Sequence, residues 1–178
     1  MEVSYYFSTH QRSSSVLDLL DYEHHWVDLE EKIHFCFPKD YKDFIQLYGS
    51  GVIDNFLTIF NPFSINLNVN LVYQIEVKRK IYEELKDFGE VLPYEFFPNV
   101  NGIIPFGSTD NGDLLFFKLE NGIVLEKVII NEARSDTWNE FDLSMIEFLY
   151  KLLNKNIVCE LFPKSFPSEK KPISFISF

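Results

Sequence analysis

The chain has 178 residues, of which 46% are hydrophobic and 24% charged, a balance typical of one folded, soluble domain. Its formal net charge of −11 disfavours general binding to nucleic acids or to anionic membranes and favours a basic partner, although acidity that only maintains solubility remains an open alternative. Aromatic residues make up 17% of the chain, which predicts a large core, an aromatic binding surface, or both.

An amphipathic helix is predicted after an N-terminal segment of mixed composition. In residues 1–13 a few aromatic side chains would form a short strand or an arm packed on the body, and serines 13–15 offer helix N-caps. Beyond them, apolar residues recur every three or four positions at Leu19, Tyr22, Trp26, Leu29 and Ile33. His24 and His25 are adjacent and point to different sides of this helix, so we expect them at the surface rather than on one metal ion.

A short helix whose two ends are both marked in the sequence follows. Pro38 fits its first position, Asp40 its first turn, and Gly49 a C-terminal position that needs a positive φ. Its predicted apolar face consists of Tyr41, Phe44, Ile45 and Tyr48. Val52-Ile53 and the following run of residues 56–60 are together interpreted as one buried strand, ended by an Asn-Pro pair.

A second long helix is predicted after an Asn-rich loop at residues 64–70. Its expected core-facing stripe is Val69, Tyr73, Val77, Ile81, Leu85 and Phe88. Gly89 ends the helix, because glycine readily adopts the left-handed conformation of a helix C-terminus. The basic cluster at 78–80 is interpreted as a solvated face rather than a phosphate site.

An antiparallel meander is predicted in the second half of the chain, after an irregular segment laid over the core. The irregular segment spans residues 90–101, and the strands are expected at 103–106, 114–119 and 123–130, with turns at 110–112 and 120–122. Pro105 indicates an edge or a bulge in the first strand, and the second strand is apolar on both faces and therefore central. A calcium loop at 109–113 is not favoured, because the alternating Asp/Asn spacing and the distal Glu are missing.

The C-terminal part is expected to contain a loop, a helix and an extension within one domain of residues 1–178. Residues 131–139 are interpreted as a polar loop that carries Trp138. Ser144 and Glu147 form a capping box, with Leu143 and Phe148 as its hydrophobic staple. Residues 154–178 interleave Pro with Phe and are too apolar for a disordered tail, so we expect them to pack on the body, with an added strand as one arrangement.

Catalytic and cofactor-binding motifs are missing from the sequence, and we expect no enzyme activity, cofactor or metal ion. The chain has no G-x-S-x-G elbow, P-loop or G-x-G-x-x-G motif, although a dyad assembled by folding around one of the scattered histidines stays open. Cys36 and Cys159 are too few and too far apart for a disulfide framework or a zinc site, and are expected to be buried free thiols. Without a signal peptide or a membrane span in the sequence, a cytoplasmic location is expected.

Several short blocks, taken in order, resemble the SUKH superfamily of Smi/Knr-type proteins. The first block is Pro-x-Asp-Tyr-Lys-x-Phe-Ile from Pro38, followed by Tyr-Gly-x-Gly-x-Ile and an apolar run that ends in Asn-Pro. The later blocks are Ile104-Pro-Phe-Gly107, Asn111-Gly-Asp113 and Ser144-x-x-Glu-Phe-Leu149. Most members have Leu-Pro where this chain has Phe37-Pro38. The resemblance covers roughly residues 28–153.

This resemblance implies an α+β fold in which a curved, mostly antiparallel sheet, flanked by helices, presents a concave face to a partner protein. Bacterial members are mostly immunity proteins that block the active site of a toxin, often a nuclease, whereas fungal relatives are linked to cell-wall assembly and signalling. The expected partner is therefore a basic toxin domain or, as the alternative, an endogenous cytosolic protein. Loops beside the predicted sheet provide the candidate partner-binding residues Asp54, Asp110, Asp113, Glu132, Asp136 and Trp138. An ordinary turn or solvent-facing role is the alternative for each of them.

Overall fold

The computed structural model describes the backbone of residues 16–178 and the side chains from residue 23 onward. The predicted N-terminal arm, the serine caps and the side chains of Leu19 and Tyr22 lie outside the described residues. Among the helices of the described part, none is both long and apolar enough to cross a membrane.

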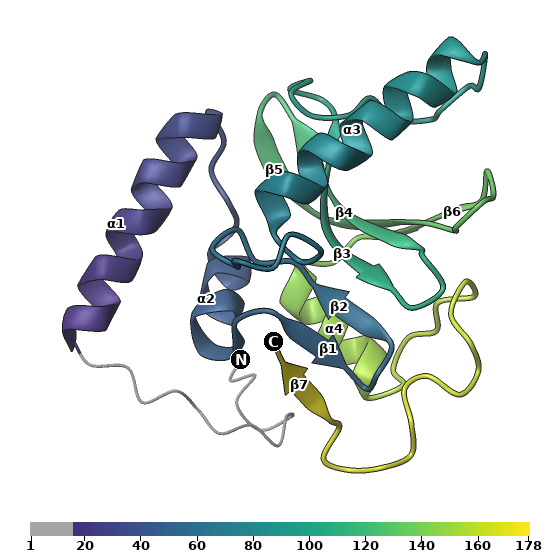
Figure 1. The fold of residues 1–178 in the computed structure, drawn as a ribbon. Coiled ribbons are helices and arrows are strands. Elements are labelled where there is room, and N and C mark those ends of the chain that lie inside the picture. The colour runs from purple at the N-terminus through teal and green to yellow at the C-terminus, as the bar shows by residue number, and fades with distance from the viewer. Residues whose placement is uncertain (1–15) are drawn as a thin grey trace.

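One antiparallel sheet organises residues 16–178, with the strand order β6-β5-β4-β3-β2-β1-β7 (Figure 1). Its strands are β1 Gly51–Ile53, β2 Leu57–Ile59, β3 Ile103–Thr109, β4 Leu114–Glu120, β5 Ile123–Asn131, β6 Trp138–Phe141 and β7 Phe175–Ser177. The helices are α1 Val16–Ile33, α2 Lys39–Tyr48, α3 Leu71–Asp87 and α4 Met145–Leu153. These elements confirm the predicted α+β class, and β3, β4 and β5 form the predicted meander.

The centre of the sheet is buried on both faces. Successive residues of a strand point to opposite faces, and the neighbours Phe116 and Phe117 of β4 illustrate this alternation. The ring of Phe116 lies 6.1 Å from that of Tyr82 on α3, whereas the ring of Phe117 lies 5.4 Å from that of Tyr41 on α2. Helix α3 therefore covers one face, and α2 covers the other.

Helices α2 and α4 are joined by one carboxylate. Asp40 in the first turn of α2 accepts a hydrogen bond from the backbone N–H of Tyr41 in its own helix and from that of Ile146 in the first turn of α4, at 2.8 and 3.1 Å. A negative charge at two helix N-termini is favoured by both helix dipoles. The predicted apolar face of α2 is confirmed, and Tyr41 also donates to the carbonyl oxygen of Phe60 at 2.6 Å.

Two predictions about the ends of elements near α2 need correction. Pro38 caps α2 instead of occupying its first position, since its ψ of 142° is extended. Residues 52–60 form a hairpin of β1 and β2 rather than one strand. Asp54 and Asn55 form its turn with φ of 52° and 54°, a conformation that Asp and Asn tolerate better than other non-glycine residues.

The predicted core-facing stripe of α3 is wrong. The buried side chains of the helix are Leu71, Gln74, Ile75 and Tyr82, whereas Tyr73 and Ile81 are 44% and 42% exposed. A stripe that steps by four residues drifts around a helix of 3.6 residues per turn, so it does not stay on one contact face. Lys78 comes to lie half-buried, and its burial lowers the pKa of its amine, so the basic cluster is only partly solvated.

Strand β3 lies inside the sheet between β2 and β4, and the register shifts between Pro105 and Gly107. Of the two arrangements that Pro105 indicated, the bulge is thus confirmed and the edge is wrong. The C-terminal extension contributes β7, which pairs with β1 and forms one edge of the sheet. The added strand that was one option for this extension is therefore present.

Gly107 should be sensitive to substitution by alanine. An added Cβ would lie 2.6 Å from the carbonyl oxygen of Thr58 on the neighbouring strand, which is backbone and cannot rotate away. We expect Gly107→Ala to lower the free energy of unfolding by about 1–3 kcal/mol in urea denaturation. Ser108→Ala is the matched control and should cost clearly less; equal losses for the two variants would contradict the packing described here.

Candidate functional site

The turns that carry most of the candidate residues meet at one end of the sheet. In a meander, alternate connections lie at the same end, which here brings together turn 54–56, turn 110–113 and loop 132–137 (Figure 1). The backbone N–H of Asp110 donates to the carbonyl oxygen of Phe56 at 2.9 Å, and that of Ala133 donates to Asp113 Oδ1 at 3.0 Å. We call these three linked turns the acidic loop cluster.

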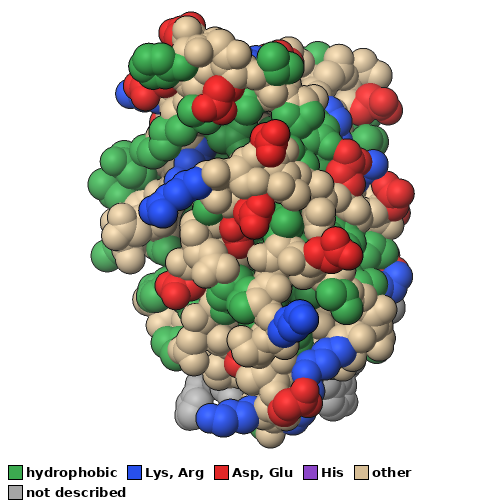
Figure 2. Space-filling model, turned by 90° about the vertical axis from the view of Figure 1, so that its right-hand side faces the viewer, with side chains coloured by type: hydrophobic (Ala, Val, Ile, Leu, Met, Phe, Trp, Pro, Cys, Tyr) green, Lys and Arg blue, Asp and Glu red, His purple; other side chains and the backbone are tan. Residues whose placement is uncertain are grey.

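Two carboxylates of the acidic loop cluster are directed to solvent. Asp110 and Asp136 are exposed, and Glu132 is half-buried. Figure 2 views the molecule from the side on which these turns lie in Figure 1, and acidic side chains are spread over the middle of this face with basic ones mainly below them. This end of the sheet therefore offers carboxylates on a backbone held by hydrogen bonds between loops.

Asp113 holds the loops together and is not exposed. The residue is only 2% exposed, and its carboxylate oxygen Oδ2 accepts a hydrogen bond from Thr109 Oγ1 at 2.7 Å. Thr109 Oγ1 in turn accepts from the backbone N–H of Asp113 at 3.1 Å, while Oδ1 binds Ala133 as described above. A partner would reach this carboxylate only after the hairpin had opened, so its role in the folded chain is structural.

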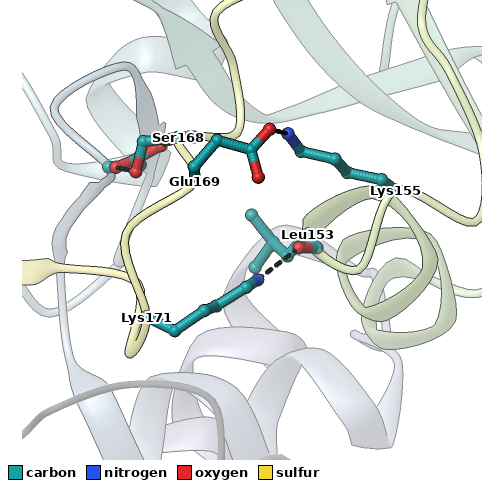
Figure 3. A network of polar contacts seen from close by, with 6 residues as sticks. Leu153, Lys155, Ser168, Glu169 and Lys171 are labelled. Atoms are coloured by element: carbon teal, nitrogen blue, oxygen red, sulfur yellow. Dashed lines mark hydrogen bonds and ion pairs between the residues drawn. The ribbon is translucent and has the colours of Figure 1, made fainter.

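Asp54 anchors the C-terminal extension. Its carboxylate accepts hydrogen bonds from the backbone N–H and the hydroxyl of Ser168, at 2.5 and 2.8 Å, and its backbone N–H donates to the carbonyl oxygen of Ser174 at 2.8 Å. Figure 3 shows the neighbouring contacts of the extension, in which Glu169 pairs with Lys155 and Lys171 Nζ donates to the carbonyl oxygen of Leu153 at 2.9 Å. Asp54 is half-buried and is committed to these bonds.

Trp138 lies in β6 instead of in the polar loop predicted for residues 131–139. The loop ends at residue 137, two residues earlier than predicted, because residues 138–141 pair with β5. The indole is half-buried and its ring lies 5.1 Å from that of Tyr94 and 5.9 Å from that of Phe116. Its sequence position beside polar residues suggested display on a loop, but strand pairing places it against the aromatic layer under α3.

Glu160, an exposed carboxylate of the C-terminal extension, was not among the residues predicted from the sequence, and its position next to Cys159 brings it to this end of the sheet. Its neighbour Cys159 is buried, and the thiol Sγ lies 3.8 Å from Asn139 Oδ1 of β6. The density of Phe and Pro in residues 154–178 was the available signal, since it indicated a packed segment. It did not indicate against which end of the sheet the segment packs.

Nucleophilic chemistry is disfavoured at Cys159. Burial, with smaller contributions from the nearby charges of Asp113 and Glu160, raises the pKa of the Cys159 thiol to about 11, so the reactive thiolate is scarce at neutral pH. Cys36 is exposed, which corrects the expectation that both thiols are buried. His24 and His25 are exposed as predicted, and His34 is exposed as well. In the described part of the chain, His, Cys, Asp and Glu form no group of three or more that could hold a metal ion.

The chain was compared with known proteins at the level of families, curated sequences and solved structures. The model of the SMI1 / KNR4 family (SUKH-1) matches residues 23–151, which is more than half of the chain. The match ends before the C-terminal extension. No match was found among the curated proteins, and none among the solved structures.

The buried Asp113 and the exposed Asp110 of the same hairpin provide a matched pair for stability measurements. Asp113→Ala removes the acceptor for Thr109 and Ala133, so we expect the free energy of unfolding to fall by about 2–4 kcal/mol. Asp110→Ala should change it by about 0.5 kcal/mol or less, because the side chain is exposed. Urea denaturation followed by tryptophan fluorescence measures both; similar losses would contradict the structural role of Asp113.

The two thiols should react at very different rates. At pH 8 in native buffer, we expect Ellman's reagent to label one thiol per chain quickly, because Cys36 is exposed whereas Cys159 is buried and protonated. The second thiol should react only after unfolding in guanidinium chloride. Cys36→Ser should abolish the fast phase, and fast labelling of that variant would show that Cys159 is accessible.

Proposed function

The chain belongs to the SMI1 / KNR4 family (SUKH-1), and from this premise we propose that it is a non-catalytic immunity protein. In this proposal it binds the basic catalytic domain of a cognate toxin through the acidic loop cluster and occludes the active site. The single observation that carries the proposal is the set of exposed carboxylates, Asp110, Asp136 and Glu160, on loops fixed to one end of a sheet. Binding without catalysis needs no nucleophile, metal ion or cofactor from the chain.

Charge supports the choice of partner. The net charge of −11 would steer a basic domain towards the chain and raise the association rate at low ionic strength. A nuclease active site attracts phosphates, so carboxylates held at a fixed spacing can occupy the same positions. A nuclease is therefore the toxin class that we favour.

Preorganisation supports the choice of surface. Asp113 and Asp54 use their carboxylates inside the molecule, to link turns and to hold the C-terminal extension. The neighbouring exposed carboxylates thus sit on loops that lose little conformational freedom on binding, which reduces the entropic cost of association. The chain is proposed to act in the cytosol, as one domain that includes the C-terminal extension.

A charge-reversal experiment tests this surface. We expect Asp110→Lys combined with Asp136→Lys to weaken binding to the cognate toxin domain about 10- to 100-fold and to reduce the salt dependence of the affinity. The control is Glu84→Lys combined with Asp87→Lys, which changes the net charge equally at exposed positions on α3. Calorimetric titration at low and high salt measures both pairs.

The partner itself is identified by a pull-down with the whole chain as bait from its own organism's lysate and secreted fraction. Recovery of a basic toxin domain that is released by high salt, and whose activity the chain inhibits, is the expected result. Recovery of an endogenous cell-wall or signalling protein would instead favour the regulatory-scaffold alternative. Equal losses for the two charge-reversal pairs would mean that the acidic loop cluster is not the contact surface.

A further inference from the structure

The C-terminal extension, residues 154–178, packs beside the acidic loop cluster and lies outside the family match. We call its residues 154–167 the wall. The family match ends at residue 151, whereas the extension runs from residue 154 to β7. Its path is held by the Asp54–Ser168 bonds, the Lys155–Glu169 pair and the bond from Lys171 to Leu153, which fix it on either side of residues 156–167 (Figure 3). A segment held at several points presents a defined surface.

An apolar hollow of about 390 Å³ lies between this wall and the end of α4. Phe162 and Pro167 are buried in its lining, and Val158, 77% exposed, marks its opening to solvent. The charged residues of the lining, Lys155, Glu160 and Lys164, are all exposed. The hollow therefore has an apolar interior with a charged rim, and its volume exceeds what one large side chain needs.

The hollow adjoins the acidic loop cluster, because two of its lining residues contact the β1–β2 turn. The ring of Phe56, in the β1–β2 turn, lies 5.3 Å from that of Phe162 and 4.7 Å from that of Phe166. The carbonyl oxygen of the same Phe56 accepts the hydrogen bond of Asp110. On the other side, Cys159 in the lining contacts β6 at Asn139. Glu160, one of the exposed carboxylates of the proposed surface, itself lines the hollow, so a partner seated on those carboxylates would lie beside it.

We propose that this hollow receives an apolar, preferably aromatic, side chain of the same basic protein partner that the carboxylates attract. This inference rests on the proposed function and deepens it. Interfaces gain most of their affinity from a few anchors buried in pockets, while surrounding charges act on rate and orientation. Because the wall lies outside the family match, the hollow makes the C-terminal extension a determinant of which partner this chain accepts.

A peptide pair separates the apolar anchor from the charge. The probes are the acetylated and amidated peptides Lys-Lys-Trp-Lys-Lys and Lys-Lys-Gly-Lys-Lys, titrated into the full ¹⁵N-labelled chain and followed by NMR. We expect the Trp peptide to bind about tenfold or more tightly and to shift the amide signals of Val158 and Phe162, since an apolar side chain is removed from water only in that case. Equal affinities, or shifts that avoid the hollow, would overturn the proposal.

Val158→Trp places a bulky side chain at the opening of the hollow. We expect it to abolish the advantage of the Trp peptide and to leave binding of the Gly peptide unchanged. The matched control is Val91→Trp, an exposed valine (94%) outside the hollow, which should keep the advantage. The proposal fails if the two variants behave alike.

Two further titrations distinguish this inference from the proposed function. Asp110→Lys combined with Asp136→Lys should weaken the binding of both peptides. If it does so, but the two peptides bind the wild-type chain equally well, the acidic surface is supported and the proposed role of the hollow is overturned. If the charge reversal has no effect on either peptide, the charge basis of the proposed function fails too. Neutral N-acetyltryptophanamide should bind at least tenfold more weakly than the Trp peptide. Equal binding would indicate a small-molecule site and would overturn the proposal that the hollow receives a side chain of a basic protein partner.

Discussion

The structure depends on burying a central strand on both faces. In β4, the adjacent rings of Phe116 and Phe117 point to opposite sides, and each is at most 2% exposed. Full burial of one such side chain stabilises the fold by about 1.5–3 kcal/mol, so each face needs its own cover. Helix α3 provides it on one side, and α2, joined to α4 through Asp40, provides it on the other.

A sheet covered in this way is a rigid frame for the turns at its end. The acidic loop cluster divides its carboxylates between two tasks. Asp54 and Asp113 accept two hydrogen bonds each and join segments distant in sequence, whereas Asp110 and Asp136 are exposed. Acidic composition alone does not reveal this division, because it arises from which donors the fold places beside each side chain.

The outer face of α3 remains apolar in part, with Tyr73 and Ile81 exposed. Period-four patterning suggested that this face is the core-facing one, and the packing of Leu71, Ile75 and Tyr82 decided otherwise. A helix with apolar residues on more than one side has several possible contact faces. Which face contacts the sheet is decided by how well its side chains interdigitate with the aromatic residues beneath the helix, and periodicity does not encode this fit.

Local signals in the sequence determined the family, the helix α2 with its buried face, the order of the meander strands, and the capping of α4 by Ser144. These features depend on residues close together in the chain, where backbone preferences and alternation act directly. Only the tertiary structure decided that residues 52–60 turn at Asp54, that Trp138 packs inward, and that Asp113 is buried. It also placed Glu160 and the hollow beside the acidic loop cluster. These outcomes depend on contacts between residues far apart in sequence, whose geometry no local pattern specifies.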